Sequence, residues 1–161
     1  MTANYYIKEG QLALASPDSN YSVVAQMESG AWTKDPSTDY RDNPDFQHVK
    51  SPDGSNGPAG PIPEGIYRIK VRPGGLKYGY PAYHLEPISG NVTKFGRGGP
   101  RGPFVIHANT GIGCIVPGSM NEGRPNFIAH RIQYSKVTNF MGQFKPAGDH
   151  YGTLYVHRSL N

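Results

Sequence analysis

The chain has 161 residues, of which 36% are hydrophobic and 17% are charged. A chain of this length can bury one hydrophobic core, so we expect a single domain over residues 1–161. Its 21 glycines and 15 prolines leave only short apolar runs, which favours a mainly β fold with one or two short helices.

The net charge excludes few classes of function, and it does not indicate a nucleic-acid partner. The formal net charge is +4, yet the basic residues are scattered and no run of five of them occurs. No stretch of eighteen apolar residues occurs either, so no membrane span is expected. Residues 1–10 lack the basic and apolar regions of a signal peptide, which predicts a protein made in the cytoplasm.

Alternating apolar residues and turn signals predict short strands along most of the chain. The first two strands would form a hairpin that turns at Glu9-Gly10. The predicted strands cover 3–8, 11–15, 21–27, 66–71, 83–87, 104–107, 114–116 and 153–157. A long polar loop is expected at about 28–60, where Asp, Asn, Ser, Pro and Gly recur.

One substantial helix is predicted after Pro125. It should begin at Asn126 and run for about ten residues. Its apolar stripe would consist of Phe127, Ile128, Ile132 and Val137.

The segment Phe104–Pro117 holds the single cysteine and a histidine seven residues before it. Two apolar, β-branched runs flank a connection that contains Asn109 and two glycines. This pattern predicts a tight antiparallel hairpin with His107 and Cys114 opposite each other.

Such a hairpin would bring an imidazole and a thiol into contact. Opposed residues carry Cβ atoms about 4.5–5.5 Å apart. A free thiol with a pKa near 8.5 needs a neighbouring base to become the nucleophilic thiolate, and His107 would be that base for Cys114. Gly111 and Gly113 leave the backbone free to present N–H groups to an oxyanion. The arrangement suits attack on an amide or ester carbonyl.

Each residue also has an ordinary structural explanation. A lone cysteine is commonly a small buried apolar residue, and a histidine at a strand end is commonly hydrogen-bonded. The joint pattern of strand, histidine, glycine-rich loop and Gly-Cys pair supports a catalytic role as strongly as it supports these structural explanations. Asn109 could orient His107, although asparagine in a tight loop more commonly serves the turn geometry.

Four segments together resemble a known family. They are Tyr40–Val49, Gly60–Ile69, Val105–His107 and Gly113–Ile115. Their residues and their order along the chain are similar to characteristic segments of the L,D-transpeptidase-like effectors delivered by type VI secretion. The resemblance extends over about residues 40–116, and its Asn-Pro and Gly-Pro-Ile-Pro-Glu-Gly segments are more specific than the histidine and cysteine.

The resemblance implies an L,D-transpeptidase-like β-sandwich or barrel that acts on the stem peptide of bacterial peptidoglycan. In that family a cysteine attacks the carbonyl of the L-centre of meso-diaminopimelate and expels the terminal D-alanine. The acyl group then passes to water, as in an L,D-carboxypeptidase, or to a D-amino acid, as in an L,D-transpeptidase. Carried onto this chain, Cys114 is the nucleophile, His107 is the base, and the backbone around Gly111 and Gly113 is the oxyanion site.

The family context is antibacterial. The resemblance implies a toxin that a type VI secretion apparatus delivers into the periplasm of target bacteria. It also implies a cognate immunity protein in the producing cell.

The chain departs from the broader L,D-transpeptidase signature. Gly111 and Ile112 stand where that signature has Ser and then His or Thr, and Val116 stands where it has an arginine. An arginine there would bind the substrate carboxylate. Another basic residue must take this role, and the candidates are Arg124 and Arg97.

Metal chemistry is not expected. The remaining histidines are His48, His84, His130, His150 and His157, and their spacings match no common zinc motif. The sequence therefore predicts neither a metal nor another cofactor.

Two other hypotheses stay open. The substituted signature positions also suit a catalytically silent module that binds the cell wall or a protein partner on the same scaffold. A papain-like hydrolase is a weaker alternative, because its cysteine precedes its histidine and the order here is reversed.

Overall fold

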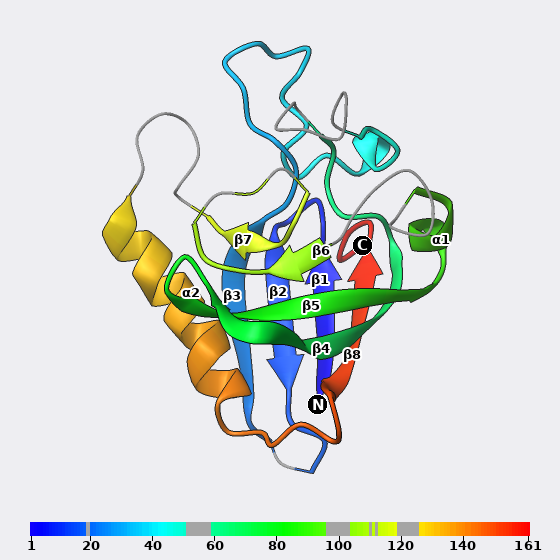
Figure 1. Cartoon of the computed structure of the whole chain (residues 1–161). Helices are drawn as coiled ribbons and strands as arrows, with labels where there is room; N and C mark the ends of the chain where they lie inside the picture. Colours follow the sequence, from blue (N-terminus) through cyan, green and yellow to red (C-terminus); the bar gives the residue numbers. More distant parts are fainter. Residues whose placement is uncertain (19, 51–58, 96–103, 110, 112, 119–125) are drawn as a thin grey trace.

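An eight-stranded sheet with the order β6-β5-β4-β8-β1-β2-β3-β7 forms the body of the protein (Figure 1). The computed structural model describes residues 1–18, 20–50, 59–95, 104–109, 111, 113–118 and 126–161. The strands are β1 (Thr2–Tyr6), β2 (Gln11–Ala15), β3 (Ser22–Glu28), β4 (Gly65–Lys77), β5 (Tyr80–Ser89), β6 (Phe104–Ile106), β7 (Val116–Pro117) and β8 (His150–His157). The helices are α1 (Asn91–Phe95) and α2 (Phe127–Met141), with a 3₁₀ turn at Pro44–Phe46. The predicted mainly β fold with short helices is confirmed.

The two ends of the sheet meet, so the sheet is nearly a closed barrel. β6 and β7 stand at opposite ends of the strand order. Ile106 at the end of β6 forms a bridge with Ile115, the residue before β7. In the middle of the sheet β8 lies between β4 and β1, antiparallel to β4 and parallel to β1.

The first hairpin forms as its sequence predicts. β1 and β2 pair antiparallel, and the turn between them ends at Gly10, which has φ +62°. A Cβ atom at Gly10 would lie only 2.3 Å from the carbonyl oxygen of Met27. Both the left-handed backbone and the close approach therefore require glycine at this turn.

The strands β4 and β5 extend further than the predicted segments 66–71 and 83–87. They pair antiparallel up to the turn that joins them, with a register shift between Val71 and Leu76. The prediction stopped early because the Pro-Gly-Gly segment after Arg72 reads as a strand end. In the structure it is an irregularity within β4.

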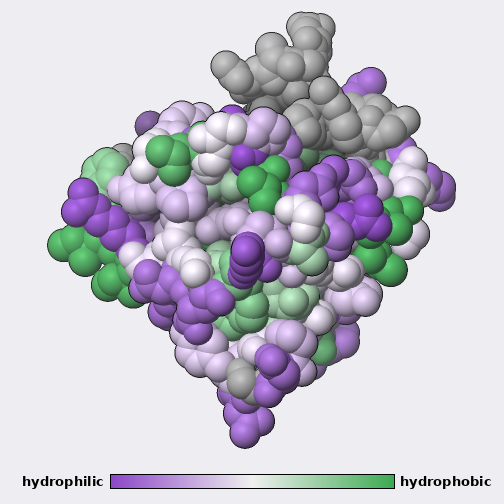
Figure 2. Space-filling view, turned by 60° about the horizontal axis from the view of Figure 1, so that its bottom comes forward, coloured by the Kyte–Doolittle hydropathy of each residue, from purple (hydrophilic) through white to green (hydrophobic). Residues whose placement is uncertain are grey.

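Helix α2 begins where it was predicted, but it buries a different face. Asn126 caps the helix by accepting a hydrogen bond from Ala129 N at 3.0 Å. Of the predicted stripe only Val137 is buried, whereas Phe127, Ile128 and Ile132 are 58%, 75% and 54% exposed. The buried residues are His130, Tyr134, Val137, Phe140 and Met141. Hydrophobic residues accordingly gather at the left margin of Figure 2, on the side of α2.

The prediction of the buried face of α2 was wrong because two polar side chains of this helix have hydrogen-bond partners inside the protein. Tyr134 donates from its hydroxyl to the carbonyl oxygen of Pro81 at 2.5 Å. His130 accepts a hydrogen bond from the backbone of Asn109. A buried tyrosine or histidine with a satisfied polar group can replace an aliphatic residue on a core-facing surface.

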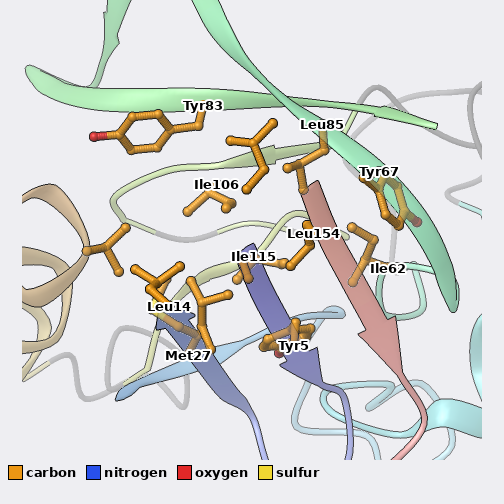
Figure 3. Close-up of a cluster of buried hydrophobic side chains, with 14 of the residues drawn as sticks. Tyr5, Leu14, Met27, Ile62, Tyr67, Tyr83, Leu85, Ile106, Ile115 and Leu154 are labelled. Atoms are coloured by element: carbon orange, nitrogen blue, oxygen red, sulfur yellow. The ribbon is translucent and has the colours of Figure 1, made fainter. Parts of the chain in front are cut away.

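One hydrophobic cluster fills the space that the sheet encloses (Figure 3). Tyr5, Tyr67, Ile106, Ile115 and Leu154 from five parts of the chain are all at most 2% exposed. The figure shows Ile106 and Ile115 near its centre, with Tyr83 above them and Leu14 and Met27 below. We call the Ile106–Ile115 bridge, where the two ends of the sheet meet, the barrel seam. Both of its side chains lie in the core.

The segment between β3 and β4 contains only the 3₁₀ turn among its described residues 29–50 and 59–64. Figure 1 shows its coloured part rising above the strand ends at the top of the view. The Tyr40 and Phe46 rings are 4.7 Å apart. Apart from the 3₁₀ turn, residues 29–50 and 59–64 thus form no helix or strand. Neither described helix has the length and hydropathy that a membrane crossing requires.

Candidate active site

The barrel seam holds the two predicted catalytic residues. Ile115 donates from its backbone N to Val105 O at 3.1 Å, and His107 donates from its backbone N to Ile115 O at 3.2 Å. This is a parallel bridge. The predicted antiparallel hairpin over Phe104–Pro117 is therefore wrong.

The direction of each short strand is set by its longer neighbour. β6 lies antiparallel to β5, and β7 lies antiparallel to β3. The chain between them must turn back within a few residues so that both strands can run in the same direction. His107 and Cys114 flank this turn instead of facing each other across a hairpin.

His107 and Cys114 nevertheless lie on the same side of the seam. Ile106 and Ile115 both enter the core, so the adjoining residues of these extended segments face the opposite way. A methyl group built on Gly111 would lie 3.3 Å from His107 Nε2 and 3.4 Å from Cys114 Cβ. The structure therefore brings His107, Gly111 and Cys114 together.

The His107 imidazole is arranged as a neutral base. Its Nδ1 lies 2.6 Å from the carbonyl oxygen of Ala108, which can only accept, so Nδ1 carries the proton and Nε2 carries a lone pair. Burial lowers the pKa of His107 to about 4, with smaller contributions from the positive charges of Lys77 and Arg72. The hydrogen bond to Ala108 opposes this shift. At neutral pH the imidazole can accept a proton.

Cys114 is half-buried and forms no disulfide. The residue before it, Gly113, is buried, and its carbonyl oxygen accepts a hydrogen bond from Ser29 Oγ at 3.1 Å. Ser29 Oγ also accepts a hydrogen bond from Ile62 N at 2.8 Å. One buried hydroxyl thus fixes the peptide unit that leads into the cysteine.

Asn109 serves the turn through its backbone. It has φ +66°, and its N–H donates to His130 Nε2 at 2.8 Å. Burial is the main cause that lowers the pKa of His130, and the charge of Arg131 adds to it, so this imidazole acts as a neutral acceptor. Helix α2 therefore holds the loop between His107 and Cys114.

The predicted carboxylate-binding residues Arg97 and Arg124 lie outside the described residues. The cations that influence His107 are instead Arg72 and Lys77, close to the β4–β5 turn. Tyr78 at the same turn places its ring 5.8 Å from the His107 ring, at an angle of 49°.

Sequence reasoning missed Ser29, His130, Arg72 and Lys77. Ser29 and His130 act through contacts with residues 84 and 21 positions away, for which a single sequence carries no signal. Arg72 had a signal, since it continues the alternation of Arg68 and Lys70 along β4.

A cleft of about 440 Å³ lies beside the seam. It is lined by Lys70, Val71, Pro73, His84, Leu85, Glu86, Phe104 and Asp149. His84 pairs with Val105 in the β5–β6 register, two residues before His107.

Within the described residues no three His, Cys, Asp or Glu side chains are grouped closely enough to hold a metal ion. In comparisons with protein-family models, curated proteins and solved structures, the chain matches none of them.

Proposed function

We propose that this protein is a cysteine L,D-carboxypeptidase or L,D-transpeptidase that acts on the stem peptide of peptidoglycan. The observation that carries the proposal is that a Cβ atom built on Gly111 would lie 3.3 Å from His107 Nε2 and 3.4 Å from Cys114 Cβ. The segments that resemble L,D-transpeptidase-like effectors supply the substrate class. The alternative of a silent binding module on the same scaffold is an outcome of the test below.

The first half of the reaction forms a thioester. His107 Nε2 takes the proton from the Cys114 thiol, and the sulfur attacks the carbonyl carbon that precedes the terminal D-alanine. The carbonyl oxygen becomes an oxyanion next to the Gly113–Cys114 backbone. When the C–N bond breaks, the proton held by His107 passes to the leaving amine, and D-alanine departs.

The second half regenerates the enzyme. Water loses a proton to His107 and attacks the thioester carbonyl, the C–S bond breaks, and His107 returns the proton to the Cys114 sulfur. The tripeptide leaves as a carboxylic acid, which releases its remaining proton to solvent and becomes the carboxylate. If the amine of another D-amino acid attacks instead, a new amide forms and the terminal residue is exchanged. One site therefore supports both reactions, and the acceptor decides the product.

The biological setting that we propose follows from the same resemblance. The enzyme would be delivered by a type VI secretion apparatus and would act as an antibacterial toxin in the periplasm of target bacteria. Its producer would hold a cognate immunity protein. No nucleic acid and no cofactor takes part in this proposal.

The test is a digest of tetrapeptide muropeptides analysed by mass. The purified protein should release D-alanine, and adding a different D-amino acid should reveal any exchange product. Cys114→Ala and His107→Gln should each abolish both products, while the Cys114→Ala protein keeps the thermal midpoint of the wild type. Equal activity in Cys114→Ala would overturn the proposal.

A second measurement identifies the silent alternative. The rate at which iodoacetamide alkylates Cys114 is followed against pH in the wild type and in His107→Gln. A fast reaction that depends on His107 supports catalysis. A thiol that reacts only after unfolding, together with no muropeptide product, supports the silent module.

A further inference from the structure

The β4–β5 hairpin brings its turn onto the candidate active site. Tyr78 and Gly79 form a two-residue turn with φ +55° and +79°, and Lys77 pairs with Tyr80. Positive φ at both positions is the geometry of a type I′ hairpin turn, which asparagine and glycine usually occupy. A tyrosine held in this conformation places its ring against His107. The turn is thus fixed beside the imidazole.

Two of the cations on this hairpin, Arg72 and Lys77, lie closest in sequence to its turn. Arg72 donates from its guanidinium to the carbonyl oxygen of Leu76, which connects the two sides of the β4 irregularity. Lys77 Nζ lies 5.5 Å from the centre of the Tyr78 ring. Both charges lower the pKa of His107, so both act on the imidazole through space.

These two cations differ from the others on the same strand. Arg68 contacts Glu86 at 3.1 Å, and Lys70 contacts Glu86 and Asp149, each at 3.0 Å. In the part of the chain that the structure describes, neither Arg72 nor Lys77 forms an ion pair with a carboxylate. The positive potential at the seam is therefore uncompensated and attracts anions.

Arg72 also has an unused donor. Its Nε atom is buried and has no hydrogen-bond partner among the described residues. A buried donor without an acceptor is unfavourable, so this guanidinium is incompletely paired within the protein. A carboxylate suits a guanidinium particularly well, because its two oxygens match two parallel N–H groups.

We propose that Arg72 and Lys77 form the subsite for the terminal carboxylate of the stem peptide, next to His107 and Cys114. The inference rests on the proposed function and adds the residues that make the enzyme select a free chain end. A carboxylate held there would place the preceding peptide bond towards Cys114. It would also neutralise the two cations and raise the pKa of His107, so the base would become stronger when substrate binds.

The subsite can be tested without peptidoglycan. Cys114 is alkylated in parallel with iodoacetate, which is an anion, and with iodoacetamide, which is neutral. The ratio of the two rates should fall about fivefold in Arg72→Gln and in Lys77→Gln, as expected for the loss of one nearby charge in a partly hydrated site. Arg68→Gln is the matched control, since it removes one charge from the same strand where Glu86 already compensates it.

An unchanged ratio in both folded variants would overturn the subsite. Arg72→Gln also loses the hydrogen bond to Leu76, so its thermal midpoint is measured alongside. Lys77→Gln removes no such hydrogen bond. If Arg72→Gln does not fold, the ratio of alkylation rates in Lys77→Gln alone decides whether the subsite exists.

A second experiment separates this inference from the proposed function. The wild type is given a tetrapeptide with a free terminal carboxylate and the same peptide as its terminal amide. Preference for the acid, lost in Arg72→Gln and Lys77→Gln, supports the subsite. Equal cleavage of both peptides would overturn the carboxylate subsite but would leave the proposed enzymatic function intact. If neither peptide is cleaved, the proposed function is overturned, and so is the stem peptide as the ligand of this subsite. The ratio of alkylation rates then still decides whether Arg72 and Lys77 attract an anion.

Discussion

Ser29 Oγ donates a hydrogen bond to the carbonyl oxygen of Gly113 at 3.1 Å, although 84 positions separate the two residues. Ser29 lies directly after β3, and Gly113 directly precedes the candidate nucleophile. The long polar segment is thereby connected to the seam. The position of Cys114 depends on a side chain that has no chemical role of its own.

Replacing Ser29 by alanine should loosen this connection. The change removes the donor to Gly113 and the acceptor for Ile62 N, both buried, and should lower the free energy of unfolding by about 2–3 kcal/mol. Ser16→Ala is the control, because its hydroxyl bonds the exposed Asp18 and its loss should cost less than about 0.5 kcal/mol. Urea denaturation measures both. Equal destabilisation by the two changes would contradict this role for Ser29.

Gly111→Ala should reduce catalysis with little loss of stability. Its methyl group would lie 3.0 Å from Val116 Cγ1 and would fill the space between His107 and Cys114. Displacing the two reacting groups by a fraction of an ångström should lower kcat/KM on tetrapeptide muropeptides about 10- to 100-fold.

Gly118→Ala is the matched control for Gly111→Ala. Gly118 is buried, whereas Gly111 is half-buried, but a Cβ atom at Gly118 would meet nothing nearer than 3.5 Å. Its kcat/KM should remain close to that of the wild type. A similar loss in both variants would show that the seam responds to any added methyl group.

His107 should make the protein less stable in mild acid. Its pKa falls from an ordinary 6.5 to about 4 in the folded state, so the unfolded chain binds the proton more readily. The resulting stabilisation is complete above pH 6.5 and is lost as the pH falls towards 4, by about 3 kcal/mol in all. His107→Gln should lack this part of the pH dependence. Urea midpoints at several pH values measure it, and parallel curves for the two proteins would refute it.

Asp42 should have the opposite effect. Burial is the main cause that raises its pKa from 3.8 to about 7, and the charge of Glu28 adds to it, while the hydrogen bond from Ser29 N opposes the shift. The folded state therefore binds the proton more readily, and stability falls as the pH rises from about 4 to 7, by up to about 4 kcal/mol.

Asp42→Asn isolates that effect. Asparagine keeps an acceptor for Ser29 N and tolerates the φ of +54°. The variant should be more stable than the wild type at pH 8, and the difference should vanish near pH 4. Asp35→Asn is the control, since hydrogen bonds from Ser37 lower the pKa of Asp35 and its pH dependence has the reverse sign. A constant difference between Asp42→Asn and the wild type at all pH values would refute the prediction.

Local patterns were sufficient for much of the fold. The β1–β2 hairpin, the third strand and the start of α2 at Asn126 follow from alternation, a glycine turn and a capping asparagine. These signals lie within a few residues of the elements they specify. The mainly β class followed from the same short-range features.

The errors concern relations between distant segments. The direction of β6 and β7 depends on β5 and β3, and the buried face of α2 depends on Pro81 O and Asn109 N as hydrogen-bond partners. A count of apolar residues cannot detect either relation. His107 and Cys114 were singled out by their spacing. The hairpin expected to unite them does not form, and both instead lie close to Gly111.

The position of β8 has a consequence for how the chain folds. Because this strand is inserted between β1 and β4, the earlier strands can join the two halves of the sheet only at the Ile106–Ile115 bridge. During synthesis the seven earlier strands would therefore leave the ribosome before the barrel could be completed. Contacts of such long sequence separation predict slow folding, which leaves an interval in which the unfolded chain is open to chaperones.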